Sequence, residues 1–300
     1  MSSGDNSTVR LVFPLWQGGV LPAYQFGSEL LEWLSPATSM PVICVPVPKF
    51  EGDFTKDVKE VEEDGLVFKP ELLTQLTAAR DELEKNKPAK IVTLGGDCLV
   101  SLAPFAYLSE KYGEDFGILW IDTHPDVSQP GQFNHVHAHV LGNLMGHGDN
   151  DIVSKLVAKP TGSSNVMIAG IHDPLDYEQE FLTKYNISTC SAKEVQAGAK
   201  SVFQWIHDRN IKKLAIHIDL DVLNEAKFHS LYFSRPNVPE NAFDGIAQGE
   251  LSMLNVINLV NQVKKDCAIV GITIAEYLPW DAINLKTMLQ KLPLIGDDSN

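Results

Sequence analysis

Residues 116–126 read FGILWIDTHPD. Six apolar or small residues lead directly into a turn that carries two aspartates and a histidine. An apolar run without polar alternation predicts a strand that is buried on both faces, which is typical of parallel sheets covered by helices. The polar turn then follows the carboxyl end of that strand, where open parallel sheets form their binding sites.

Other parts of the chain repeat this pattern, and segments with helical spacing of apolar residues separate them. The expected strands are Val9–Pro14, Pro41–Val45, Lys90–Leu94, Phe116–Asp122, Asn165–Ile171, Lys213–Val222 and Cys267–Ala275. Three helical faces are expected from Leu72, Leu76, Ala79 and Leu83, from Ala199, Val202, Phe203 and Ile206, and from Met253, Val256, Ile257 and Val260. Because strands that alternate with helices need crossover connections, the sequence predicts an α/β protein with a mostly parallel sheet covered on both faces.

Composition narrows the class of protein. The 300 residues are 44% hydrophobic and 21% charged, which is ordinary for a globular protein. The net charge is −15, and a chain this acidic is a poor partner for nucleic acid or for an anionic membrane surface. No linker or repeat interrupts the pattern, so we expect residues 1–300 to form a single domain. The stretches 50–65 and 230–249 are expected to be loops.

The cysteines and the N-terminus indicate the cellular compartment of the protein. Cys44, Cys190 and Cys267 lie in or beside apolar runs, and no CxxC pair occurs, so we expect reduced core thiols. The N-terminus is polar, without the apolar stretch of a signal peptide, and no apolar run is long enough to span a membrane. These features predict a cytoplasmic protein.

Polar clusters follow four of the expected strands. They are GGDC at 95–98, DTHPD at 122–126, DLD at 219–221 and Glu276. Alternate side chains of an extended segment point to one side, so Asp122, His124 and Asp126 can converge, and so can Asp219 and Asp221. The alternatives are an exposed turn for the first group and a solvated edge strand for the second.

Converging carboxylates repel one another unless a cation neutralises them. Four carboxylates with one or two imidazoles are enough to hold two divalent ions, and oxygen-rich ligation of this kind suits Mn²⁺. Two such ions roughly 3.5 Å apart can share a water and lower its pKa. The sequence therefore predicts a two-metal site at this edge of the sheet.

The order of these motifs resembles the arginase/agmatinase ureohydrolase family. That family has GGDH, DAHxD and SxDxD motifs and a glutamate near the last strand. This chain has GGDC, DTHPD, HIDLD and Glu276 in the same order over residues 91–276. The resemblance implies a three-layer α/β/α sandwich, a single arginase-like domain, and assembly into homo-oligomers, either trimers or hexamers.

The resemblance also implies roles for individual residues. The first Mn²⁺ would be held by Cys98, Asp122, Asp126 and Asp219, and the second by Asp122, His124, Asp219 and Asp221. His139 lies at the position of the family's proton-shuttling histidine at the mouth of the site, and Glu276 lies where the family holds the substrate guanidinium. A metal-bridging hydroxide would attack the guanidinium carbon, and Asp126 would carry its proton to the leaving amine.

Two positions near the metals depart from the family pattern. Cys98 stands where the family has a histidine ligand, and a thiolate prefers Zn²⁺, Fe²⁺ or Ni²⁺ over Mn²⁺. Cys98 is either a ligand with an altered metal preference or a thiol that leaves the first site weak or empty. His217 stands where the family has a serine, and it is either a ligand or a hydrogen-bonded neighbour of the ligands.

The substrate loop 128–139 departs as well. It lacks the pattern of Asn and Ser residues with which arginases recognise the amino-acid head group, so arginine itself is not favoured. His135 and His137 alternate with His139 and are candidate substrate contacts, as is Asp173. The alternatives are an exposed loop or an additional metal contact for the two histidines, and a solvated turn for Asp173.

The leading hypothesis is a metal-dependent hydrolase with two Mn²⁺ per chain that cleaves a linear C–N bond in a small cationic guanidino or amidino compound. A damaged first metal site would instead leave a catalytically impaired or non-catalytic arginase-like protein that acts by binding. A metal amidohydrolase related to histone deacetylases is a third interpretation, but the order of the motifs fits ureohydrolases better.

Overall fold

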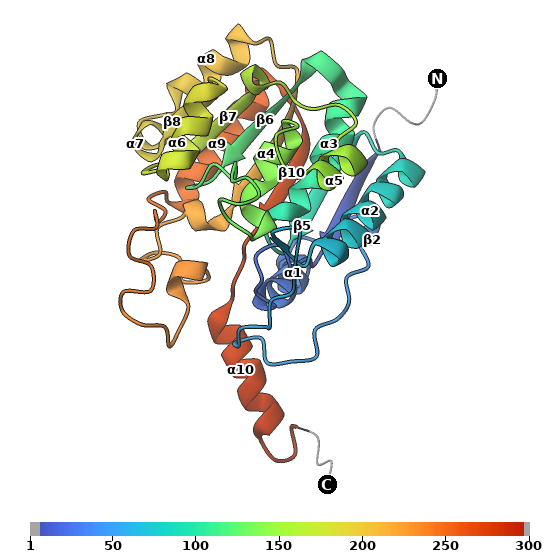
Figure 1. Cartoon of the computed structure of the whole chain (residues 1–300), viewed down its shortest axis with the longest axis vertical. Helices are drawn as coiled ribbons and strands as arrows, with labels where there is room; N and C mark the ends of the chain where they lie inside the picture. The colour runs from blue at the N-terminus through green and yellow to red at the C-terminus, as the bar shows by residue number, and fades with distance from the viewer. Residues whose placement is uncertain (1–6, 297–300) are drawn as a thin grey trace.

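The computed structural model describes residues 7–296 (Figure 1). The strands are β1 (Thr8–Phe13), β2 (Val42–Cys44), β3 (Glu62–Glu63), β4 (Leu66–Val67), β5 (Lys90–Gly95), β6 (Phe116–Ile121), β7 (Val166–Ile171), β8 (Ser188–Ser191), β9 (Lys213–Asp219) and β10 (Ala268–Ala275). The α-helices are α1 (Ala23–Leu34), α2 (Lys69–Asn86), α3 (Leu102–Tyr112), α4 (Val140–Leu144), α5 (Asn150–Leu156), α6 (Asp176–Lys184), α7 (Ala192–Gln196), α8 (Lys200–Asp208), α9 (Met253–Asp266) and α10 (Trp280–Lys291).

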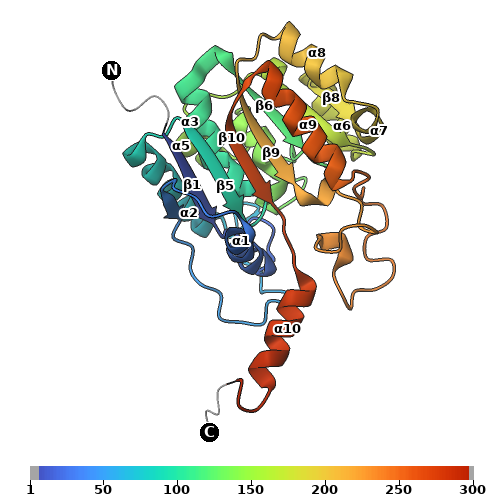
Figure 2. The same ribbon diagram turned by 180° about the vertical axis from the view of Figure 1, so that it is seen from behind.

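Within these residues, eight strands form one sheet in the order β2-β1-β5-β10-β9-β6-β7-β8, and every neighbouring pair is parallel. Helices lie on both faces of the sheet (Figures 1 and 2). The expected three-layer α/β/α sandwich is therefore confirmed. All seven expected strands are present, with ends shifted by at most three residues.

Two apolar clusters fill the spaces between the layers. On the face seen in Figure 1, α2, α3 and α5 pack on the sheet, and the predicted face of α2 is fully buried: Leu72, Leu76, Ala79 and Leu83. On the opposite face, shown in Figure 2, α8 and α9 pack on the sheet, and Val202 and Ile206 of α8 are buried. Burial of the sheet on both sides explains why its central strands are apolar at nearly every position.

The predicted face of α9 is wrong in part. Met253 and Ile257 are exposed, and the buried residues are Val256, Leu259 and Val263. Apolar residues occupy more than one stripe of this helix, so the periodicity alone could not choose the stripe that packs on the sheet.

Three other local features differ from expectation. β8 reads STCS and has no apolar run to mark it as a strand. The stretch 50–65 was expected to be a loop throughout, but its end forms part of the short antiparallel β3–β4 pair. Cys44 is exposed because β2 is an edge strand, whereas Cys190 and Cys267 are buried as predicted.

The four strands with polar carboxyl ends are consecutive neighbours in the sheet: β5, β10, β9 and β6. Their ends therefore meet at one edge of the sheet. Because β9 lies inside the sheet, the alternative of a solvated edge strand at 213–222 is excluded. β9 ends at Asp219, and residues 220–222 form a 3-10 turn where the strand was expected to continue.

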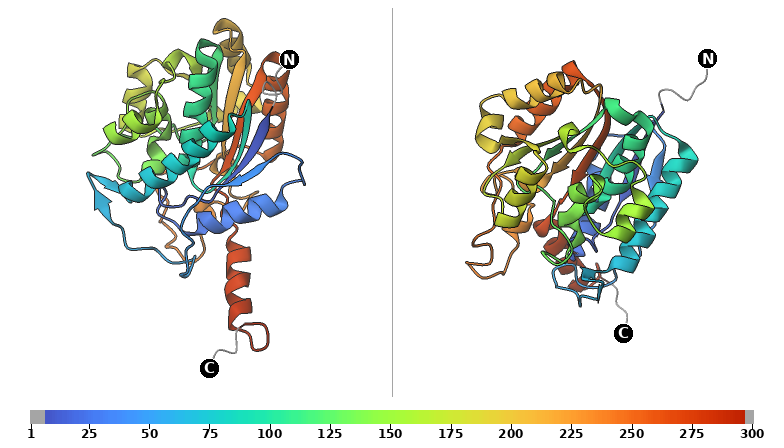
Figure 3. Two further views of the ribbon diagram at one scale, coloured as in Figure 1. Left: turned by 90° about the vertical axis from the view of Figure 1, so that its right-hand side faces the viewer. Right: turned by 45° about the horizontal axis from the view of Figure 1, so that its top comes forward.

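α10 extends away from the body of the molecule (Figure 3). Its first turn is anchored, because Trp280 is buried and its indole Nε1 donates a 2.7 Å hydrogen bond to the Leu231 oxygen. Farther along the helix, Leu285, Met288 and Leu289 are exposed. No helix in the described part of the chain is long and apolar enough to cross a membrane.

Gly96, in the GGDC motif, allows three chain segments to approach closely. A Cβ atom at this position would lie 1.8 Å from the carbonyl oxygen of Leu15. The Gly96 oxygen itself accepts a 2.7 Å hydrogen bond from the Glu276 amide. The glycine thus joins the end of β5 to the segment after β10.

We expect Gly96→Ala to lower the free energy of unfolding by roughly 3 kcal/mol, because the added methyl group meets backbone that cannot move aside without strain. The matched control is Gly162→Ala, at an exposed position where a Cβ has nothing within 4 Å. The control should change stability by less than about 1 kcal/mol. Urea denaturation measures both variants, and equal stabilities would contradict the close approach.

Candidate metal centre

Asp122 lies at the centre of the site, and the turn after β6 holds it in place. Its side chain is fully buried. Oδ2 accepts a 3.0 Å hydrogen bond from the indole Nε1 of Trp120, and Oδ1 accepts a 2.7 Å hydrogen bond from the His124 amide. The strand holds one oxygen and the turn holds the other, so local sequence sets the position of this carboxylate.

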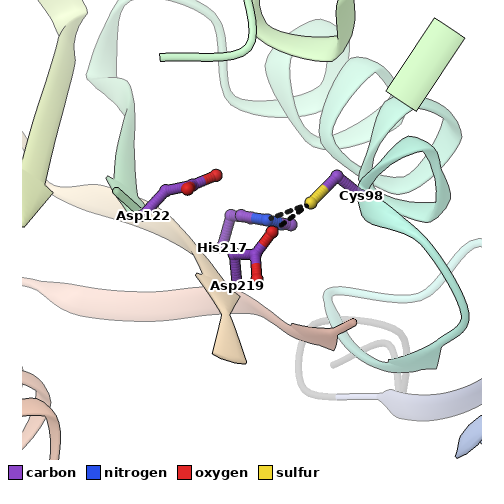
Figure 4. Close-up of side chains that lie close together, drawn as sticks. All are labelled: Cys98, Asp122, His217 and Asp219. Carbon is purple, nitrogen blue, oxygen red and sulfur yellow. Dashed lines mark hydrogen bonds between the residues drawn. The ribbon is translucent and has the colours of Figure 1, made fainter. Parts of the chain in front are cut away.

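A first cluster joins three strand ends (Figure 4). Cys98 begins the 3-10 turn Cys98–Ser101 after β5, His217 and Asp219 come from β9, and Asp122 follows β6. All four side chains are buried, and their potential ligand atoms lie within 4.8 Å of one another. The Sγ atom of Cys98 donates to Oδ2 of Asp219 at 2.8 Å and lies 3.3 Å from Nε2 of His217. The Cys98 thiol therefore lies among the other potential ligands.

A second cluster lies beside the first and shares Asp122 with it. The potential ligand atoms of Asp122, His124 and Asp221 also lie within 4.8 Å of one another. Nδ1 of His124 is 3.2 Å from Oδ2 of Asp221 and 3.6 Å from Oδ1 of Asp122. The shared aspartate is where a ligand that bridges two ions would lie.

Asp126 and Glu276 line the same cavity with an unusual backbone. Their φ angles are +51° and +65°, in the left-handed region that non-glycine residues adopt uncommonly. Asp126 belongs to neither cluster, and its buried Oδ2 has no hydrogen-bond partner among the described residues. The Glu276 carboxylate accepts hydrogen bonds from the Tyr24 hydroxyl and, at 3.3 Å, from the Cys98 amide.

The acidic groups of the site have no Lys or Arg partner. Among residues 7–296, no Lys or Arg forms an ion pair with any of the five: Asp122, Asp126, Asp219, Asp221 and Glu276. Burial, and after it the charge of neighbouring carboxylates, raises the pKa of Asp126, Asp219 and Glu276 well above the usual range. These groups keep their protons at pH values where exposed carboxyls have lost them, unless a cation replaces the protons.

The donor set fits divalent cations. The buried Oδ2 of Asp126 and Oδ1 of Asp221 have no hydrogen-bond partner among the described residues, and each is a free oxygen donor. Burial lowers the pKa of His217 to about 3, so its imidazole is neutral and offers a lone pair. Burial alone would lower the pKa of His124, but Asp221 and Asp122 raise it well above the ordinary value. A cation between these groups would replace the His124 proton.

A cavity of about 500 Å³ opens above these residues. Its floor is acidic and includes Asp126, Asp219, Asp221 and Glu276. Phe133, Leu175 and Ile246 also line it and are exposed, so they lie toward the mouth, as do the exposed Asp57 and Glu60. The cavity thus combines an anionic floor with an entrance that carries both apolar side chains and carboxylates.

The three alternating histidines do not share one environment. His135 and His137 line the cavity. His139 does not line it: the residue is fully buried, and its Nε2 lies 3.0 Å from the Phe133 oxygen. The expected position of His139 at the mouth of the site is therefore wrong. Residues 136–139 form a 3-10 turn, whereas only an extended segment would have put the three side chains on one side.

Asp173 also lies away from the cavity. Its side chain is 91% exposed, and its Oδ2 lies 3.2 Å from Nδ1 of the neighbouring His172. The expectation that Asp173 contacts the substrate is wrong, and the alternative of a solvated turn holds. Glu178 of α6 lines the cavity instead, with its carboxylate accepting a 2.8 Å hydrogen bond from the Leu175 amide.

Tyr24 is a site residue that sequence reasoning missed. It lies in α1 and lines the cavity, and it is 252 residues from its partner Glu276. No motif surrounds it, so only the packing of α1 against the end of β5 could have revealed it. A hydroxyl at this place sets the orientation of the Glu276 carboxylate.

The family model described as "Arginase family" matches residues 48–237. The chain belongs to the arginase family. The resemblance inferred from the motifs is confirmed.

Curated arginases are distant relatives of this arginase-family chain. The arginase of Staphylococcus aureus strain MRSA252 is 25% identical over 198 residues, which cover 61% of this chain and 60% of the relative. Arginase 2 of Arabidopsis thaliana, described as chloroplastic/mitochondrial, is 22% identical over 223 residues, which cover 74% of this chain and 57% of the relative. The chain thus spans less than two thirds of the length of these relatives.

Solved structures show the same fold over more of the chain. The arginase of Entamoeba histolytica, solved with L-ornithine, has a TM-score of 0.74 at 19% identity and covers 91% of each chain. The formimidoylglutamase of Bacillus subtilis has a TM-score of 0.63 at 13% identity and covers 91% of this chain and 79% of its own. The names of these two proteins refer to different substrates. The shared fold alone therefore does not indicate a substrate for this chain.

We expect divalent metal to bind more tightly as the pH rises above the usual range of exposed carboxyls, because the raised pKa values of Asp126 and Asp219 mean that metal must displace protons. Calorimetry in buffers of different ionisation enthalpy measures the protons released per ion. Asp126→Asn should release fewer protons, and Asp173→Asn is the control that should not differ from wild type. Binding that is independent of pH and releases no proton would contradict the site.

Proposed function

We propose that this chain is a metal-dependent hydrolase that cleaves a linear C–N bond in a small cationic guanidino or amidino compound. One observation carries the proposal. Buried carboxylates from the ends of β6, β9 and β10 converge on the floor of one cavity, with no Lys or Arg ion pair among the described residues. Such a group of acids requires protons or cations to neutralise it. Metal ions and a cationic substrate both supply that charge.

We further propose two divalent ions per chain. The ligands would be the two clusters around Asp122 together with Asp126, and Mn²⁺ is the expected ion for the oxygen-rich cluster of Asp122, His124 and Asp221. When bound, a pair of such ions lowers the pKa of a water so that it is a nucleophile near neutral pH.

The residues of the chain then orient the substrate and move one proton. Glu276 is held by Tyr24 and by the Cys98 amide, so its carboxylate can fix the angle at which a guanidinium enters the site. Asp126 has an unpartnered oxygen at the cavity floor, which can accept a proton from the attacking water. The water oxygen bonds to the central carbon, the C–N bond breaks, and Asp126 gives the proton to the departing amine.

The cavity supports a substrate with an apolar tail. Arg235 is the only Lys or Arg among the described lining residues, and it already pairs with Asp57 at 2.8 Å. A tail carboxylate, as in arginine, would find no open cation there. Phe133, Leu175 and Ile246 offer contact to an alkyl or aromatic tail instead.

We also propose that residues 1–300 form one domain, that copies assemble into a trimer or hexamer, and that the compartment is cytoplasmic. The continuous eight-stranded sheet supports a single domain. The exposed Leu285 and Met288 of the projecting α10 support contact between copies. Four unpaired cysteines support a reducing compartment.

A second candidate function is that of a non-catalytic protein that acts by binding. It is favoured by the Cys98 thiol, which donates its hydrogen to Oδ2 of Asp219 and so uses an oxygen that the first metal would need. If that hydrogen bond persists in the presence of metal, the first site stays empty.

We expect the metal-loaded protein to release urea or an amide, together with an amine, from a panel of guanidino and amidino compounds. Compounds with alkyl or aromatic tails should react faster than arginine. Asp126→Asn and Glu276→Gln should each lower kcat/KM by at least about 100-fold, because they remove the proton carrier and the cation-binding carboxylate.

The matched control is Asp173→Asn, the same chemical change at an exposed aspartate, which should leave kcat/KM within about twofold. Failure of a fully metal-loaded protein to turn over any member of the panel would contradict the hydrolase and favour the binding protein.

A further inference from the structure

We propose that His217 and Cys98 are both ligands of the first metal site, which makes it a mixed thiolate, imidazole and carboxylate site that prefers Zn²⁺ to Mn²⁺. The second site, formed by Asp122, His124 and Asp221, has no sulfur and keeps the preference for Mn²⁺. The chain would then hold two different metals. This inference refines the metal centre on which the proposed function rests, but its test requires no turnover.

The spacing of the donor atoms supports a compact site (Figure 4). Sγ of Cys98 is 3.3 Å from Nε2 of His217 and 2.8 Å from Oδ2 of Asp219. Around a tetrahedral Zn²⁺, sulfur and nitrogen ligands are about 3.6 Å apart, as follows from Zn–S and Zn–N bonds of about 2.3 and 2.0–2.1 Å. The three atoms therefore need to separate by less than about 1 Å to admit the ion. The Cys98 hydrogen that now bonds Asp219 leaves as a proton when metal binds.

His217 has the surroundings of a metal-ligating histidine. Its Nδ1 lies 2.8 Å from the Ser101 hydroxyl, which leaves Nε2 as the nitrogen that faces Cys98. The ring also stacks on Trp120, with ring centroids 3.6 Å apart and an interplanar angle of 10°. A hydrogen bond at the second nitrogen and a fixed ring plane are what hold an imidazole ligand in one tautomer and orientation.

The chemistry of the donor atoms then determines which metal ion the first site prefers. Thiolate and imidazole are softer donors than carboxylate, and they favour Zn²⁺, whereas Mn²⁺ prefers oxygen. Cys98, His217 and Asp219 provide sulfur, nitrogen and oxygen on three sides, and Asp122 provides the fourth ligand, shared with the second cluster. A single Cys beside Asp122 and Asp219 would be a poor Zn²⁺ site, but the imidazole of His217 adds a second soft donor.

The test uses the full chain loaded with Co²⁺, a visible probe for Zn²⁺ sites. We expect a thiolate-to-Co²⁺ charge-transfer band in wild type, absent in Cys98→Ser. His217→Asn keeps a polar atom near Ser101 but removes Nε2, and it should weaken Zn²⁺ binding by at least about 100-fold in competition with a chelator. Cys190→Ser changes a buried thiol outside the site and should leave the band and the Zn²⁺ affinity unchanged.

Cys98→His is a second variant at this position, for the case that Cys98→Ser fails to fold. It restores a nitrogen donor, so it should bind metal without the charge-transfer band and shift the first site toward Mn²⁺. Thermal unfolding of each metal-free variant establishes that it folds.

Two outcomes would overturn the inference. Co²⁺ bound in wild type without the charge-transfer band would exclude Cys98, and unchanged Zn²⁺ affinity in a folded His217→Asn variant would exclude His217. A Zn²⁺-selective site in a protein that hydrolyses no guanidino compound would leave this inference intact and contradict the proposed function alone.

Discussion

The mutual repulsion of buried carboxylates is the constraint on which the rest of the structure depends. Asp122, Asp126, Asp219, Asp221 and Glu276 are each less than a tenth exposed and face one another at the ends of central strands. Burial and neighbouring carboxylates both raise the pKa of Asp126, Asp219 and Glu276, so the folded chain binds protons there until a stronger cation arrives. A parallel sheet with its apolar strands covered on both sides supplies enough burial of nonpolar surface to hold such an unfavourable group together.

Several backbone features maintain this arrangement. Gly96 lets the end of β5 lie against Leu15 while its oxygen binds the Glu276 amide, so two distant segments are fixed at one point. Asp126 and Glu276 adopt left-handed backbone that a side chain disfavours, which indicates strain held by the surrounding fold. Strain of this kind aims a side chain at a site in a way that regular strand or helix geometry does not permit.

The arginase-family fold is shared by proteins whose names differ in substrate, so what distinguishes this chain lies in particular side chains. Cys98 and His217 set the donor atoms at the first metal position, and Phe133, Leu175 and Ile246 at the entrance bear on what fits above it. These two features are physically separate, since one concerns the floor of the cavity and the other its mouth. A change of metal need not change the substrate, and each can be tested without the other.

The sequence by itself determined the α/β architecture, the order of the metal-ligand motifs and the convergence of Asp122 and Asp219, because these depend on strand periodicity and on the common edge of parallel strands. It could not place His139, because three alternating histidines share one side only if the segment is extended, and the chain makes a 3-10 turn there. The contact of Tyr24 with Glu276 and the approach of His217 to Cys98 were decided only in the tertiary structure. Both join segments more than one hundred residues apart, and local periodicity carries no information about which distant side chains the packing of layers brings together.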